Sequence, residues 1–168
     1  AADFGLNGSR ITMNTPVLQG FKRDGKPYRL DAETAEQDIR APHVVELRAL
    51  DALMGQGPAG WVRMKTDRGV FDNRKETLQL PSLVKLLTDG GYDVRLDSAD
   101  VELKSGVVRS GGPVDVVSPD GTMTSQKLEV RNNGKELVFT GRVRTVLHSE
   151  RPPAAKAGEP KPNEPKKE

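Results

Sequence analysis

Cysteine is absent from the sequence, which excludes disulfide bonds and zinc sites built from thiolates. Aromatic residues make up only 4% of the 168 residues and hydrophobic residues only 35%, so we expect one modest domain instead of a large enzyme core. No apolar run approaches the roughly 18 residues of a membrane-spanning helix. Because the chain starts at Ala1 without a signal-like segment, we expect a processed or trimmed soluble piece.

Neither sign of charge dominates the sequence. The 26 basic and 24 acidic side chains create no broad field that would attract DNA or RNA, so nucleic-acid binding is not expected. From Glu150 onward the chain is rich in proline, lysine and glutamate and has no large apolar residue. This composition predicts a disordered tail over residues 150–168, and its charges are too mixed for a polybasic anchor.

Turn-forming residues recur between Ile11 and Leu147 at the short intervals typical of an all-β protein. These signals are Asp24-Gly25, 55–60, Asp67-Arg68-Gly69, 89–91, 105–106, Gly111-Gly112-Pro113, 118–121 and 132–134. The segments between them alternate apolar and polar residues, as Val94 and Leu96 do with Arg95. Such alternation predicts strands with one apolar and one solvated face, and 111–113 is expected to be a bulge or turn.

The stretch from His43 to Met54, HVVELRALDALM, fits two kinds of element. It contains good helix formers, and Val44, Leu47 and Leu50 share one helical stripe with Met54. The same residues also suit a strand. Periodicity alone does not decide between a helix and a strand here.

A weak internal repeat runs along the chain. Four similar phrases each place an apolar residue before a small polar stretch, and these apolar residues are separated by intervals of 34, 32 and 27 residues: Leu30, Met64, Leu96 and Met123. The intervals are too irregular for a strict solenoid but suit a rolled sheet built from repeated two-strand units. A general hairpin-rich β protein would also look self-similar in this way.

The segment 11–38, ITMNTPVLQGFKRDGKPYRLDAETAEQD, resembles the N-terminal signature of the LptC family of lipopolysaccharide transport proteins. The matching positions are Asn14, Pro16, Gly20, Asp24, Gly25, Pro27, Tyr28, Leu30, Ala32, Ala35 and Gln37. Thr15, between the first two, departs from the pattern. Later segments up to residue 148 resemble the wider LptA/LptC/OstA-type domain in a more generic way.

The resemblance implies an all-β fold: a rolled, twisted antiparallel sheet, an open β-jelly-roll with a hydrophobic interior that holds lipid chains. It makes the ambiguous stretch at His43–Met54 a strand. We therefore expect a linker over residues 1–10, the roll over 11–149 and the tail over 150–168. The resemblance also implies a periplasmic location, an inner-membrane helix preceding this chain, and two partners, the LptBFG exporter and LptA.

The expected function is lipopolysaccharide export: the protein receives the lipid from LptBFG on its N-terminal side and passes it to LptA along a hydrophobic groove. Alternation assigns the lipid-binding walls to Val62, Met64, Val94, Leu96, Val114, Val116, Leu137, Phe139 and Val143. Further wall residues are expected at Leu30, Val45, Leu47, Leu78 and Leu80. A closed core has the same alternation, so each position is open to either interpretation.

The segment 136–147, ELVFTGRVRTVL, reads as one long final strand without proline. An exposed strand edge offers unpaired backbone groups to another chain, so we expect this edge to contact an LptA-type partner. The expected partner-binding residues are Leu137, Phe139, Val143, Thr145 and Leu147.

The alternative function is a closed β-sandwich interaction or structural module of the cell envelope with no lipid cargo. An enzyme acting on envelope polysaccharide ranks third.

Motifs for other chemistry are weak, and we expect no enzyme activity, cofactor or metal site. Residues 55–60 match G-x-G-x-x-G, but no βαβ unit surrounds them and Pro58 lies inside the loop. His43 and His148 are the two histidines and lie far apart in sequence. Carboxylate pairs such as Asp97 and Asp100 are expected by chance among 24 acidic residues. Trp61 is expected to cover a rim of the core.

Overall fold

The computed structural model describes residues 4–7 and 9–148, and this part of the chain forms one sheet of 17 strands. The strands are β1 (Phe4–Asn7), β2 (Arg10–Asn14), β3 (Val17–Phe21), β4 (Pro27–Asp31), β5 (Thr34–Asp38), β6 (Val44–Gly55), β7 (Trp61–Asp72), β8 (Thr77–Leu80), β9 (Val84–Thr88), β10 (Asp93–Leu96), β11 (Ala99–Glu102), β12 (Val107–Ser110), β13 (Val114–Ser118), β14 (Gly121–Ser125), β15 (Lys127–Arg131), β16 (Glu136–Thr140) and β17 (Arg144–Leu147). Short 3₁₀ turns occupy Gly57–Ala59 and Asn132–Gly134. The predicted all-β, rolled antiparallel architecture is confirmed.

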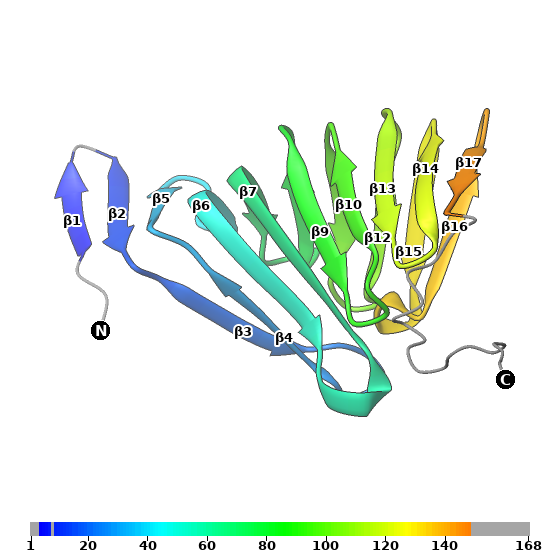
Figure 1. Ribbon diagram of the computed structural model, residues 1–168. Coiled ribbons are helices and arrows are strands. Elements are labelled where there is room, and N and C mark those ends of the chain that lie inside the picture. The colour runs from blue at the N-terminus through cyan, green and yellow to red at the C-terminus, as the bar shows by residue number, and fades with distance from the viewer. Residues whose placement is uncertain (1–3, 8, 149–168) are drawn as a thin grey trace, which may run out of the picture.

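The sheet folds over along a line of corners into two halves that share the long strands β6 and β7. Half A contains β1, β2, β5, the first part of β6, the second part of β7, β8, β11, β12, β15 and β16, in that order of pairing. Half B contains β3, β4, the second part of β6, the first part of β7, β9, β10, β13, β14 and β17. Figure 1 shows the strands following one another from the blue end at β1 and β2 to the orange end at β17.

The corners arise where the backbone leaves the regular extended conformation. Ala49, inside β6, has a φ of 55°, and Thr15, between β2 and β3, has a φ of 50°. Residues 111–113 lie between β12 and β13 and contain two glycines and a proline, which favour a bend. The prediction of a bulge or turn there is confirmed.

The corner at Ala49 explains why the stretch 43–54 looked partly helical. Val45 and Leu47 point inward before the corner, whereas Leu50, Ala52 and Met54 point inward after it. Before the bend the odd-numbered side chains point inward, and after it the even-numbered ones do. The inward residues 47, 50 and 54 are therefore spaced like one stripe of a helix. The segment is strand β6, as the family resemblance implied.

The signal at Asp67-Arg68-Gly69 was interpreted as a turn, and this interpretation is wrong. These residues lie inside β7, where Arg68 pairs in register with Arg48 of β6. The bend that they make is the corner of β7, after which Gly69 and Phe71 face inward. A corner and a hairpin turn require similar residue types, so composition did not separate them.

The interpretation of residues 136–147 as one strand is also wrong. The segment forms two strands, β16 in half A and β17 in half B, which pair with β15 and β14 respectively. Gly141 and Arg142 separate them with φ angles of 83° and 47°. Positive φ is costly for an ordinary residue, and here it turns the chain through the corner.

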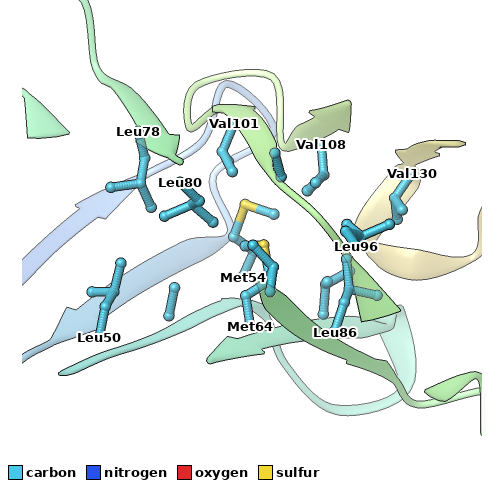
Figure 2. Close-up of a cluster of buried hydrophobic side chains, with 14 of the residues drawn as sticks. Leu50, Met54, Met64, Leu78, Leu80, Leu86, Leu96, Val101, Val108 and Val130 are labelled. Atoms are coloured by element: carbon cyan, nitrogen blue, oxygen red, sulfur yellow. The ribbon is translucent and has the colours of Figure 1, made fainter. Parts of the chain in front are cut away.

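The inward rows of both halves form one apolar core. Met54, Met64, Leu86 and Leu96 of half B meet side chains from half A, and each is at most 1% exposed. Figure 2 shows them converging with Leu78, Leu80, Val101, Val108 and Val130. The middle of the roll is therefore filled by its own side chains.

Candidate functional site

The predicted wall residues of the middle strands all lie in the core. Val62, Met64, Val94, Leu96, Val114 and Val116 are at most 2% exposed. Leu30, Val45, Leu47, Leu78 and Leu80 are at most 5% exposed. The inward direction that alternation predicted is thus confirmed for these positions. In this conformation their contacts are with one another and with the opposite half of the sheet.

The apolar interior continues to both ends of the roll, where it is less covered. Met13 on β2 and Leu18 on β3 pack against the core at one end and are only partly buried. Met123 on β14 and Leu137 and Phe139 on β16 do the same at the other end. An apolar path therefore runs from the first strands of the roll to the last.

Val143 does not belong to this interior, contrary to the expectation from alternation. It lies in the corner between β16 and β17 and is 49% exposed. The corner interrupts the period of two, and no later strand of the described chain covers this end. Thr145 and Leu147, expected at the partner edge, lie on β17, all of which is exposed.

Polar contacts between hairpin turns close the roll on the side opposite the corners, and we call this line of contacts the seam. The hydroxyl of Tyr28 in half B donates a hydrogen bond to Glu76 Oε1 in half A at 2.5 Å. Lys104 Nζ lies 3.4 Å from Glu76 Oε2. Burial, together with the hydrogen bond to Glu76, raises the pKa of Tyr28 far above its ordinary value. The tyrosine is therefore held as a neutral donor across the seam.

A second contact of the seam joins the β3–β4 turn to the β11–β12 turn. The backbone N–H of Arg23 donates to the carbonyl of Lys104 at 2.8 Å. Lys22 is buried beside Gly106, and its Nζ lies 2.9 Å from Asp24 Oδ2. The backbone N–H of Lys26, followed by the Lys22 ammonium, lowers the pKa of Asp24. A buried ammonium thus has a charged partner, as it requires.

The third contact of the seam explains the glycines of the 55–60 loop. Gly60 has a φ of 100°, and a Cβ there would lie 2.7 Å from the carbonyl oxygen of Asn133. Gly134 has a φ of 82°, and its Cβ would lie 2.8 Å from Val62 Cγ2. The loop is a β6–β7 hairpin turn whose Gly55 and Gly60 lie against the β15–β16 turn, whereas Gly57 faces open space and serves the positive φ of the turn. These glycines therefore serve the turn and its packing and not a dinucleotide.

The part of the resemblance signature from Gly20 to Tyr28 lies at this seam, although sequence reasoning did not assign it that role. Gly20 lies directly opposite Tyr28 in the β3–β4 register, where any larger side chain would overlap the tyrosine ring. Gly25 has a φ of 85° in the turn that carries Asp24. The predicted hairpin at 23–27 is confirmed. The signal for the seam was the Asp-x-x-Pro-Tyr spacing, but its partners at 76 and 104 were not visible in the sequence.

Two strand edges, not one, end the roll at its C-terminal side. Within the described residues, β16 pairs with β15 alone and β17 pairs with β14 alone. The backbone N–H of His148 donates to the carbonyl of Asp120 at 2.9 Å. Because every second residue of an antiparallel strand bonds to the same neighbour, residues 146 and 144 also direct their backbone N–H and C=O groups toward β14. The N–H groups of Thr145 and Leu147 consequently point away from the sheet.

Within residues 4–7 and 9–148, no group of three or more potential ligands could hold a metal ion. His43 is half-buried near Arg74, and His148 is exposed beyond β17. In the same part of the chain, no helix has the length and apolar character needed to cross a membrane. The predicted tail over 150–168 lies outside the described residues. The segment 1–10, expected to be a linker, contains strand β1.

The fold and its interior define a rolled antiparallel β domain with an apolar path that is open toward both ends and closed by a polar seam. The family model for lipopolysaccharide-assembly, LptC-related proteins matches residues 7–148. The chain belongs to this family, as its signature at residues 11–38 indicated. A search of curated proteins found no match.

Membership of the family implies involvement in lipopolysaccharide transport. Proteins of this family are transport and binding components of the cell envelope that face the periplasm.

Proposed function

We propose that this protein carries lipopolysaccharide along its interior, receiving it from the LptBFG exporter at the β1–β3 end and passing it to LptA at the β16–β17 end. The observation that supports this most is the apolar path from Met13 and Leu18 to Leu137 and Phe139. Each methylene kept out of water contributes about 0.8 kcal/mol, so burying ten would stabilise the bound lipid by about 8 kcal/mol. No covalent chemistry is required.

The filled middle of the roll sets a condition on this proposal. Because Met64 and Leu96 are at most 1% exposed, acyl chains can enter only if the two halves move apart and the core side chains rearrange. The seam is where the halves meet through a few polar contacts. It is therefore the line along which we expect them to separate.

The second candidate, a closed β-sandwich module without lipid cargo, is favoured by the same packing. A core in which Val62, Val94 and Leu78 are inaccessible to solvent is what a ligand-free sandwich requires. The two functions differ in one measurable respect, which is whether lipid reaches the inward residues.

Photo-crosslinking distinguishes the two candidates. A photoreactive residue at Leu96 or Phe139, both on inward rows, should capture lipopolysaccharide. The same residue at Val138, which points outward between Leu137 and Phe139 on β16, should not capture it. Equal capture at Phe139 and Val138 would contradict the groove, and capture at none of the three positions would favour the closed sandwich.

We further propose that β17 pairs edge to edge with an LptA-type partner and joins the two interiors. A few backbone hydrogen bonds at about 0.5–1.5 kcal/mol each give the modest, reversible affinity that a relay needs. Thr145→Pro removes an N–H that points away from β14 and should abolish capture of the partner. Photo-crosslinking of lipid at Leu96 should persist in this variant. Unchanged capture of the partner would exclude β17 as the contact.

A membrane-spanning helix preceding Ala1 would hold the β1–β3 end beside the exporter. The N-terminal position of β1, β2 and β3 at one end of the roll supports this orientation. A full-length protein that remains in the membrane fraction after carbonate extraction supports the anchor, and one released by carbonate contradicts it.

A further inference from the structure

Three cationic side chains stand side by side on the outer surface of half B. Lys65 on β7 pairs in register with Lys85 on β9, and Lys85 pairs in register with Arg95 on β10. Residues directly opposite each other on neighbouring strands point to the same face, with Cβ atoms about 5 Å apart. The three like charges therefore repel one another, which disfavours this arrangement unless an anion lies between them.

The carboxylate beside Lys65 is already engaged by another residue. Asp51 accepts two hydrogen bonds from Arg63, at 3.0 and 2.8 Å. Its distance to Lys65 Nζ is 3.9 Å, at the limit of an ion pair. Asp51 therefore neutralises Arg63 and leaves the ammonium of Lys65 largely uncompensated.

The other two cations have even less compensation. Among the described residues, neither Lys85 nor Arg95 has a side-chain hydrogen bond or an ion pair. Asp115 lies opposite Arg95 in register, and Asp93 lies two residues before it on the same face, yet neither carboxylate bonds to it. Lys65, Lys85 and Arg95 against Asp93 and Asp115 leave one positive charge in excess, since Arg63 and Asp51 neutralise each other.

These side chains line a surface groove of about 360 Å³. Arg63 and the three cations form its walls together with Asp93 and Leu87, which is 41% exposed. The opposite face of the same strands carries the buried residues Met64 and Leu96. The sheet thus separates this groove from the apolar interior.

We propose that this groove is a binding site for a phosphate-bearing ligand. Phosphoryl oxygens would accept hydrogen bonds from the ammonium groups of Lys65 and Lys85 and from the planar guanidinium of Arg95, which can donate two parallel bonds. The ligand removes the repulsion between the three cations. This site goes beyond the proposed carriage of acyl chains, because those occupy the other face of the sheet.

Titration of the ¹⁵N-labelled protein with pyrophosphate at low salt tests the site. Amide signals of β7, β9 and β10 should shift, and Lys65→Gln with Lys85→Gln should weaken binding by about tenfold or more. The matched control is Arg48→Gln with Arg68→Gln, which removes the in-register cation pair at the corner. This control should leave the affinity within about twofold of the native value. Equal weakening by both double variants, or no shift in these strands, would overturn the proposal.

A second arm identifies the source of the phosphate. Sedimentation with vesicles of phosphatidylglycerol, compared with phosphatidylcholine, tests a lipid headgroup at a bilayer surface. If the protein binds the anionic vesicles and the Lys65/Lys85 variant does not, the site exists and its phosphate belongs to a membrane lipid. If the protein binds pyrophosphate but not the vesicles, the site exists and its phosphate-bearing ligand is not part of a membrane. Lipid crosslinking at Leu96 should be unchanged in the variant, so failure of this site and failure of the carrier proposal are distinguishable.

Discussion

The middle of the roll and its C-terminal end both direct apolar side chains to the inner face of the sheet but differ in burial. Leu96 on β10 is fully buried, whereas Leu147 on β17 is 68% exposed. In the middle, strands of both halves face each other and the seam holds them together. At the end, β16 and β17 have no further strand beside them among the described residues. Alternation therefore specifies where a side chain points but not whether anything covers it.

The largest expected difference between the two regions is in stability. Leu96→Ala should lower the free energy of unfolding by about 2–5 kcal/mol, because it leaves a cavity in a packed core. Leu147→Ala should change it by less than about 0.5 kcal/mol. Urea denaturation of both variants measures the difference. Similar losses would mean that another segment covers β17 in solution.

A loss within the same range is expected where the 132–135 turn packs against the β6–β7 turn. Gly134→Ala forces a positive φ on alanine and places its Cβ against Val62 and the Trp61 carbonyl, which should cost about 3 kcal/mol. Gly57→Ala is the matched control, because Gly57 also has a positive φ but faces open space. It should cost about 1 kcal/mol. Thermal unfolding of both variants compares them, and equal costs would argue against close contact of the turns.

The smallest of these effects concerns the seam and depends on pH. Tyr28→Phe removes the hydrogen bond to Glu76 and should lower the free energy of unfolding by about 1.5 kcal/mol at neutral pH. The fold raises the pKa of Tyr28, so the folded protein holds this proton more tightly than the unfolded chain. The contribution is therefore complete below pH 10.0, the ordinary pKa of tyrosine, and is lost as the pH rises above it.

Urea denaturation at several alkaline pH values checks this sign. The native protein should lose stability more steeply above pH 10.0 than the Tyr28→Phe variant. Parallel pH profiles for the two proteins would show that Tyr28 is not held neutral at the seam.

The sequence contained enough information for the fold class and for the direction of most inward residues. Local patterns also marked the β3–β4 hairpin at 23–27, whose Gly25 adopts a positive φ. The corners were harder to identify, because a bend inside β7 uses the same kinds of residue as a hairpin turn. At Ala49 the corner shifts by one residue the alternation of inward and outward side chains in β6. A fixed period of two or 3.6 residues cannot describe such a shift.

Contacts between distant strands were not predictable from one sequence. The seam joins Tyr28 to Glu76, and the outer groove joins Lys65 to Lys85 and Arg95, through a register that only the folded sheet defines. Alternation alone placed Arg95 on the outer face. It could not show which cations would lie opposite it.

Methyl NMR of the four methionines tests most directly whether lipid enters the interior. Met13 and Met123 lie toward the two ends of the apolar path, and Met54 and Met64 lie in its filled middle. In a titration with lipopolysaccharide, the carrier account predicts that the ¹³C-methyl signals of all four move. Shifts of Met54 and Met64 would show that the two halves part to admit acyl chains. If these two signals stay fixed while the lipid is in excess, the core is closed and the central claim is contradicted.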